Sequence, residues 1–578
     1  MVLNGEEKIK LLAYFIVIFT FSISLSFPLI FRYVGTYAAP PSVYAIKILD
    51  SGSLTNSVYE LTNGYWKTST MVETDFPLPS VLISIIILVS GVPKEYALFL
   101  PIVGLASIIY FILARKVLCT RQNTETYGLL FSALFYAFLT FNHLSGGYCG
   151  RATLGEAFLA LFIFSCILFF SQCLRGRPQR SMVALLILVA VAIGYTYYVS
   201  IVSVIVFTIG MIVSTSFAAF FIPSLSKPKG LLIRRSTIWL TSLVIGTLCL
   251  ICNPFFTNFA RTINFGSFMN NMIQYAKIAL RIETQSPQAL LYSRLGEVDS
   301  LTTILGQITL TIKYASIIAI PVGLFIYRPR LKKHTIIHKI TFFFLLIAFF
   351  CSLAEFSYLL YGSFYPFRHA EKYGLIALLF LIEGLIVRYK TPTRVFLRRA
   401  RKLHILSMPW KRLRFNKKKL VAMFTVLIVS FGCWGSFRVA WYYGIAKPSS
   451  FHNVTPVSEF LLTCSSNENP MILTGDVYYT AYIFFRVSLY SNNNVAPEPL
   501  DKDAIALYHL LKTGEVEYFL VRMQERNTKY LLIVEDGKPI SGSAWGFQII
   551  PPKSSALQEQ AFSIIYTDGR AKLFRINK

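Results

Sequence analysis

The chain contains repeated stretches of about 20 residues with no charged side chain, and this feature constrains its fold more than any other. The first stretch covers residues 11–31, and comparable apolar runs recur until about residue 441. A helix of about 20 residues is long enough to cross a hydrocarbon core of about 30 Å. With 54% hydrophobic residues, the chain is also too apolar for an ordinary soluble protein. The sequence therefore predicts a polytopic α-helical membrane protein.

The first apolar run is predicted to be a retained span rather than a signal peptide. A signal peptide has an apolar core of about 7–15 residues and a cleavage site of small residues. Residues 11–31 are longer than this and end in the bulky segment 27–31. Lys8 and Lys10 precede the run, which favours a cytoplasmic N-terminus.

The short apolar run at residues 78–92 determines the predicted topology. Its 15 residues would reach about 22 Å as a helix, which is too short for a full span. We therefore predict a re-entrant or interfacial helix here and a second span at 96–114. The later predicted spans, which bring the total to eleven, are 126–142, 153–173, 183–197, 199–221, 237–255, 301–327, 340–361, 373–387 and 420–441.

The distribution of basic residues supports this topology. The predicted inward loops hold 28 Lys and Arg residues, against 11 in the outward segments before residue 442. If residues 78–92 formed a full span, every later loop would change sides. All 28 of these Lys and Arg residues would then lie outside, against the positive-inside rule. The net charge of +28 thus reflects cytoplasmic loops of an integral membrane protein of the cell membrane. No basic domain with interleaved aromatic residues is present, so no nucleic-acid partner is expected.

Two domains are predicted. Residues 1–441 form the multispan domain, whose long outward loops are 32–95 and 256–300, with short helices near 43–49 and 269–282. Residues 442–578 form a small extracytoplasmic α/β domain. Its predicted strands are 471–474, 516–521, 530–534, 546–550, 562–566 and 571–576, the last two joined by a hairpin turn at 567–570. The nine cysteines form no CxxC pair, so neither a disulfide framework nor a zinc site is predicted.

Glu73 and Asp75 are the first candidate site residues. They lie two residues apart in the first outward loop, just before the chain returns to the bilayer. Such a pair can supply a general base, or it can hold a divalent metal against a phosphate leaving group. Asp50 and Glu60 are further carboxylates in this loop. The alternative is that these residues are solvated loop acids with no chemical role.

A second group of candidates lies at the outer mouth of the fourth predicted span. Arg151 and Glu156 are five residues apart, and Glu156 falls inside the membrane boundary. A carboxylate there is costly and is usually functional or paired. A substrate-binding pair and a buried structural ion pair both remain open. His143, nearby, is either a further binding residue or an interfacial histidine.

The third candidate is Arg368, between the ninth and tenth predicted spans. A guanidinium group can hold a lipid-linked phosphate bidentately. The alternative is anchoring to lipid headgroups, a role that would suit Lys372 equally well. Glu355 lies within the ninth predicted span and is a functional candidate by its position.

The layout resembles the polytopic membrane glycosyltransferases of the GT-C type. A first span, a long acidic loop, a short re-entrant helix, a multispan bundle and an outer α/β domain follow one another in the same order. The resemblance implies a lipid-linked sugar phosphate as donor, an extracytoplasmic glycan or protein as acceptor, and contact with membrane lipids. It implies that Asp75 and Glu73 are catalytic or bind a divalent metal such as Mg or Mn. It also implies that Arg368, Arg151, Glu156 and His143 bind substrate.

The sequence departs from this pattern at two places. The position near Tyr195 that is often a histidine is not a histidine here, and an aspartate is missing from the first loop. Many GT-C enzymes carry an aspartate about a dozen residues before the glycine that ends the first loop helix. Here that glycine is Gly52, and the upstream residues 38–41 read Ala-Ala-Pro-Pro. Either Asp75 substitutes from later in the loop, or the chain is a non-catalytic scaffold or assembly protein of the same fold. A transporter is less favoured, because no pair of Gly/Pro-broken spans occurs in corresponding halves.

Overall fold

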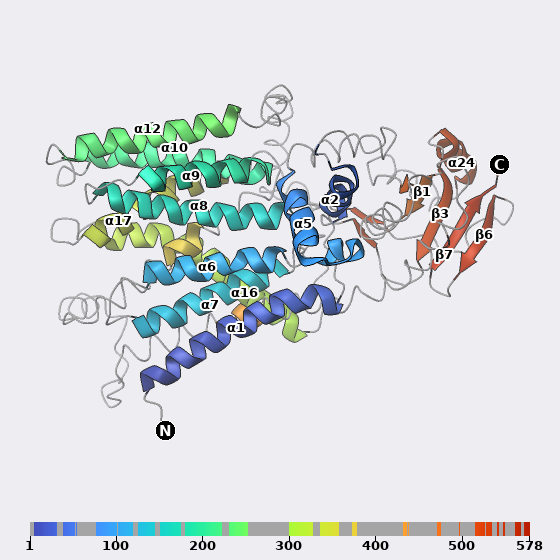
Figure 1. Cartoon of the computed structure of the whole chain (residues 1–578), viewed down its shortest axis with the longest axis horizontal. Helices are drawn as coiled ribbons and strands as arrows, with labels where there is room; N and C mark the ends of the chain where they lie inside the picture. The colour runs from blue at the N-terminus through green and yellow to red at the C-terminus, as the bar shows by residue number, and fades with distance from the viewer. Residues whose placement is uncertain are drawn as a thin grey trace, which may run out of the picture.

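The fold is described from a computed structural model of the chain. The described residues are 5–31, 39–52, 54, 77–100, 102–118, 125–144, 151–174, 180–221, 230–251, 300–327, 336–357, 373–378, 430, 432–435, 437, 460, 471–474, 496–497, 515–525, 528–534, 540–542, 547–549, 561–567 and 571–577. They form a bundle of long helices and, toward the C-terminus, a β-sheet (Figure 1).

The long helices lie side by side along the bundle (Figure 1). They are α1 (Gly5–Phe31), α6 (Ile102–Leu118), α7 (Glu125–Leu144), α8 (Arg151–Leu174), α9 (Arg180–Gly194), α10 (Tyr198–Phe221), α12 (Gly230–Ile251), α16 (Ser300–Tyr327) and α17 (Ile336–Ser357). Each helix begins within seven residues of the start of a predicted span and ends within four residues of its end. The largest difference is at the start of α12, which begins seven residues before the predicted span 237–255. The helical prediction for these runs is therefore confirmed.

Large apolar side chains cover the outside of this bundle. Ile18 on α1 is 65% exposed, Leu240 on α12 is 65% exposed, and Phe325 on α16 is 82% exposed. Large exposed apolar side chains on several helices are unusual in a soluble protein and suit contact with lipid tails. In the described residues, Glu6–Ser26 and Ser200–Phe217 have the length and hydropathy of a complete span, and seven shorter helical stretches are also apolar. These features agree with the predicted membrane domain.

The interior of the bundle is packed with aromatic rings. Phe207 on α10 lies between Phe162 on α8 and Tyr373, with ring centroids 6.1 and 5.9 Å away. Phe170 and Phe343 join α8 to α17 in the same way, at 5.0 Å. These contacts place α8 and α10 at the centre of the bundle, so residues on their facing sides are shielded from lipid.

The short run that decided the predicted topology is a short helix. α5 (Leu78–Ser90) has 13 residues and lies across the ends of the bundle helices (Figure 1). Its last turn ends at Gly91, which has φ +66 and whose N–H donates to the Ile87 carbonyl. Glycine adopts this left-handed conformation without steric cost. The prediction of a short helix at 78–92, too short for a full span, is confirmed, and whether it is re-entrant or interfacial stays a prediction.

The second predicted span began too early. Residues 94–99 form the 3-10 helix η1 (Lys94–Phe99), and the long helix α6 starts only at Ile102. The reason is Pro101, because the residue before a proline is driven out of the helical region. Leu100 accordingly has an extended backbone, with ψ 129.

The C-terminal residues form a mixed sheet in the order β2-β1-β3-β7-β6. Its strands are β1 (Met471–Thr474), β2 (Ala496–Pro497), β3 (Thr528–Val534), β6 (Phe562–Thr567) and β7 (Ala571–Ile576), and β4 (Ile540–Gly542) pairs separately with β5 (Phe547–Ile549). β1 runs parallel to β3, whereas β7 runs antiparallel to both β3 and β6. The predicted strands 471–474, 530–534, 546–550, 562–566 and 571–576 and the hairpin are confirmed.

The predicted strand at 516–521 is wrong. These residues belong to helix α24 (Val516–Glu525), which buries Val516, Phe519 and Met523. These positions follow the helical spacing i, i+3, i+7, so one face packs against the sheet. A short apolar run is compatible with a strand or a helix. Here the spacing of the buried residues over ten positions indicates a helix. Arg522 adds a hydrogen bond to Glu525 one turn later.

The predicted topology places residue 53 and residue 541 on the same, outer side. Single cysteines at Ser53 and Ser541, in a background without the native cysteines, should both react with an impermeant thiol reagent in intact cells. A cysteine at Ser181, at the exposed start of α9 and predicted to face inward, should react only after permeabilisation. Labelling of only one of the two outer positions would overturn the eleven-span topology.

Candidate functional site

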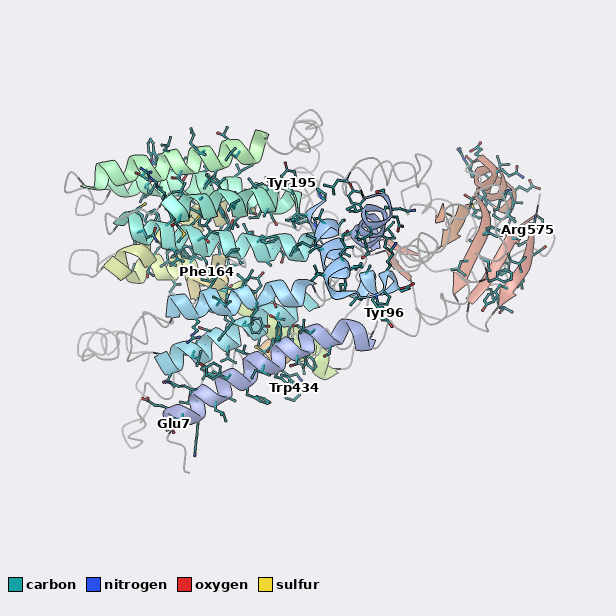
Figure 2. The ribbon with its side chains drawn as sticks, viewed as in Figure 1. Glu7, Tyr96, Phe164, Tyr195, Trp434 and Arg575 are labelled. Carbon is teal, nitrogen blue, oxygen red and sulfur yellow. The ribbon has the colours of Figure 1, made fainter. Side chains whose placement is uncertain are left out.

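The tight connection between α9 and α10 and the first turns of α10 contact three segments that carry or adjoin the predicted site residues. The connection includes Tyr195 and directly follows the end of α9. Figure 2 shows Tyr195 at the end of the bundle near α5. The three contacts are made by the start of α5, by the start of α8 and by the short helix at residues 373–378.

The first contact fixes the end of the outward loop. The backbone N–H of Leu78 donates to the carbonyl of Tyr195 at 3.1 Å. Pro77, before it, ends the stretch that contains Glu73 and Asp75. These two acids lie outside the described residues, so their role stays a prediction. The loop nevertheless returns to the bundle directly beside the connection between α9 and α10.

The second contact is a close approach between α8, at Gly155, and the start of α10. A Cβ atom added at Gly155 would stand 2.7 Å from the Tyr197 Cβ and 2.9 Å from the Ser200 Oγ, closer than such atoms normally approach. Glu156 follows, and its side chain is only 1% exposed. It lies within electrostatic range of the fully buried Tyr110 on α6. Glu156 is therefore buried within the bundle, while its predicted place inside the membrane boundary and its role stay predictions.

The partners predicted around Glu156 are only partly described. Arg151 is the first residue of α8, as expected for a residue at the mouth of the span, and His143 lies in the last turn of α7. The side chains of both lie outside what the structure describes, so the predicted pairing of Arg151 with Glu156 stays a prediction. Tyr110 was not predicted, because an isolated tyrosine in an uncharged span gives no signal in the sequence.

The third contact holds the short helix at 373–378. The Tyr373 hydroxyl donates to the carbonyl of Ser203 on α10 at 3.4 Å. Gly374 lies so close to α16 that an added Cβ would stand 2.7 Å from the backbone carbon of Ser316. Arg368 and Lys372 precede this helix and lie outside the described residues. The side chain of Glu355, on α17, is not described either.

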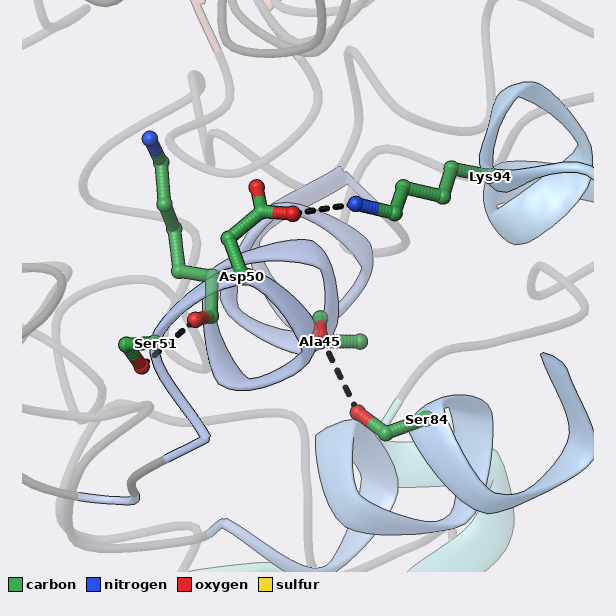
Figure 3. A network of polar contacts seen from close by, with 6 residues as sticks. Ala45, Asp50, Ser51, Ser84 and Lys94 are labelled. Carbon is green, nitrogen blue, oxygen red and sulfur yellow. Dashed lines mark hydrogen bonds and ion pairs between the residues drawn. The ribbon is translucent and has the colours of Figure 1, made fainter. Parts of the chain in front are cut away.

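Helix α2 (Ala39–Ser51) forms the base of the outward loop and packs on α5. The Ser84 hydroxyl donates to the Ala45 carbonyl at 3.1 Å, and Asp50 pairs with Lys94 of η1 (Figure 3). The helix ends at Gly52, with φ +66, as the sequence predicted. It begins four residues earlier than the predicted 43–49.

Asp50 is thereby accounted for as a structural residue. The Asp50 and Lys94 side chains are 45% and 44% exposed, and exposed ion pairs of this kind contribute about 0–1 kcal/mol. The pair therefore fixes orientation between α2 and η1 more than it adds stability. Among the described residues, no group of three or more His, Cys, Asp or Glu side chains is placed to hold a metal ion. The predicted Mg or Mn ligands, Glu73 and Asp75, are not among them.

Comparison with solved structures gives a distant likeness. No protein-family model matches the sequence, and no curated protein matches it significantly. The crystal structure of ArnT from Cupriavidus metallidurans bound to undecaprenyl phosphate aligns over 98% of this chain and 97% of that chain. The identity is 11% and the TM-score is 0.43.

Proposed function

We propose that the chain is a membrane glycosyltransferase of the GT-C type. It transfers a sugar from a polyprenyl-phosphate-linked donor to an extracytoplasmic acceptor. In this proposal the lipid tail stays among the spans, the donor phosphate meets a fixed positive charge at the interface, and the acceptor arrives from the aqueous side. The donor sugar and the acceptor are left open.

The observation that carries the proposal is the attachment of three distant segments to the connection between α9 and α10 and to the start of α10. Leu78, Gly155 and Tyr373 contact residues within 195–203, which comprise this connection and the first residues of α10. Chain connectivity limits Asp75 to within about 11 Å of Leu78, and Arg368 to within about 18 Å of Tyr373, measured between Cα atoms. The predicted acid pair, the Arg151–Glu156 segment and Arg368 are therefore all tethered to one end of the bundle.

Each group then has a chemical role that its type can perform. Asp75 is the general base that accepts the acceptor's proton, or it binds a divalent metal, and Glu73 assists. Arg368 holds the donor phosphate through its two-pronged guanidinium group. Glu156, which is buried, keeps a negative charge or a proton near the mouth of α8. Arg151 and His143 bind the substrate, as the resemblance implies.

One observation favours a second candidate, a non-catalytic scaffold of the same layout. α2 begins at Ala39, and the positions before its terminal Gly52 where GT-C enzymes often carry an aspartate read Ala-Ala-Pro-Pro. In this alternative, the outer loops and the C-terminal sheet bind a partner enzyme. The two candidates differ in one measurable property, since only the enzyme transfers sugar.

The test uses the full chain in proteoliposomes with a panel of radiolabelled polyprenyl-phosphate sugars. The enzyme should transfer label from at least one donor, and Arg368→Lys should raise the KM for that donor several-fold, because a point charge cannot replace the guanidinium fork. Arg180→Lys, an exposed arginine at the other end of the bundle, is the matched control and should change nothing. Absence of transfer across the panel would favour the scaffold. Equal KM values in Arg368→Lys and wild type would remove Arg368 from donor binding.

A further inference from the structure

Three helices at the centre of the bundle enclose a small cavity. It lies where α8, α10 and α17 pack together. Its wall is formed mainly by Cys166 and Phe170 of α8, Phe207 and Met211 of α10, and Phe344 and Ile347 of α17. None of the lining residues is more than 6% exposed, so the cavity lies inside the protein and not on its surface. We call it the three-helix cavity.

The packing beside the cavity is close, which keeps the three helices in place around it. A Cβ atom added at Gly210 on α10 would stand 2.8 Å from the Cys351 sulfur on α17, one turn from Ile347. On the side of α8, the rings of Phe162 and Phe207 lie 6.1 Å apart. The distances between the helices are therefore fixed by contacts next to the cavity, and the lining side chains do not close it.

The chemistry of the wall disfavours water and ions. The lining side chains contain only carbon, hydrogen and sulfur, from phenylalanine, isoleucine, methionine and cysteine. A buried water needs about two to four polar partners, and among these side chains only the sulfur groups of Cys166 and Met211 can form even weak hydrogen bonds. A charged ligand would lose its hydration with nothing to replace it. The wall therefore suits an apolar occupant.

We propose that the three-helix cavity binds a small apolar molecule. The cavity offers about 10 Å³ to the centre of a water-sized sphere. A void of this size admits a guest of about one to three non-hydrogen atoms. Xenon, a short hydrocarbon or a small halocarbon meets this limit, and such molecules dissolve in the bilayer that surrounds the predicted membrane domain. Dry cavities lined by aliphatic and aromatic side chains bind guests of this class.

Dispersion forces supply the binding free energy. The lining atoms of an empty void lack contact partners on one side, and a guest restores these contacts. The sulfur atoms of Met211 and Cys166 are polarizable, which favours a polarizable guest. The cavity involves none of the residues assigned to sugar transfer, so the inference does not depend on the proposed function.

The test is xenon binding to the full chain in nanodiscs, followed by NMR through the methyl signals of ¹³C-labelled methionine. Met211 lines the cavity and is 1% exposed, whereas the control, Met523 on α24, is 0% exposed in the packed C-terminal region. Met211→Leu identifies the Met211 signal by its loss. The Met211 signal should shift with xenon pressure until it saturates, and the Met523 signal should shift little. A Met211 shift no larger than that of Met523, or one that never saturates, would overturn the proposal.

Variants then connect the xenon effect to the cavity. Ile347→Phe places a larger side chain in the wall and should abolish the saturable shift of Met211. Ile347→Leu keeps the side-chain volume and should preserve the shift, which controls for the substitution itself. An unchanged saturable shift in a folded Ile347→Phe variant would show that xenon binds elsewhere and would contradict the proposal. The wild-type titration decides the proposal by itself if Ile347→Phe does not fold.

Discussion

Asp75→Asn should lower the rate of sugar transfer by about 10²–10⁴-fold while leaving the protein folded. The substitution removes the carboxylate that accepts the acceptor's proton and keeps the shape of the side chain. The loop itself should stay in place, because the Leu78 N–H to Tyr195 bond that fixes its end does not involve Asp75. The measurement is single-turnover transfer from the donor identified in the panel, at saturating acceptor.

The matched control for this prediction is Asp50→Asn. Asp50 is a carboxylate at the base of the same loop, but it pairs with Lys94 and is 45% exposed, so its loss should change transfer by no more than a few-fold. Asp75→Asn should also elute as wild type does in size-exclusion chromatography. If Asp75→Asn transfers as fast as wild type, Asp75 takes no part in the chemistry. Equal losses in both variants would indicate a disturbed loop instead of a lost catalytic group.

Gly155→Ala should destabilise the bundle by about 1–3 kcal/mol, the usual cost of overpacking a tightly packed interior. The added Cβ would stand 2.7 Å from the Tyr197 Cβ and 2.9 Å from the Ser200 Oγ, so α8 and α10 must separate. Because Glu156 follows Gly155 and Leu78 is bonded beside Tyr197, this separation should also reduce transfer in the folded fraction. Stability is measured by unfolding in mixed micelles of mild detergent and SDS.

Gly194→Ala is the matched control, since a Cβ at that position meets nothing within 4 Å. The gain in helix propensity, up to about 1 kcal/mol, is larger for Gly155 within α8 than for Gly194 at the end of α9, so it cannot explain a lower stability of Gly155→Ala. Gly155→Ala should therefore be clearly less stable than Gly194→Ala. Equal stability in the two variants would show that α8 and α10 can separate at no cost, and that the contact does not fix the candidate site.

The positions of the helices could be predicted because each depends on a local property of the chain. An uncharged run of about 20 residues forms a long helix wherever it lies, as in α7 and α10. The run behind α5 is too short for a span whatever surrounds it. The β6–β7 hairpin likewise follows from the residues of its own turn.

Local signals failed where two local preferences compete. The run at 516–521 fits a strand as well as a helix until its neighbours are counted, and the pattern of Val516, Phe519 and Met523 then selects the helix. The start of α6 was misplaced because hydropathy continues through Lys94–Phe99 while Pro101 interrupts the backbone. A longer sequence window would have indicated the helix at 516–525. The steric effect of Pro101 would have indicated the later start of α6.

The sequence by itself determined that this chain has a helical membrane bundle followed by a small sheet, and it identified charged residues that stand out against an apolar background. Only the tertiary structure decided which of these residues share a region. The attachment of Leu78, Gly155 and Tyr373 to the α9–α10 connection and the start of α10 depends on how each helix is rotated and which helix it packs against. Hydropathy and charge carry no information about either, because an uncharged helix is equally apolar from every side until its neighbours bury one of them.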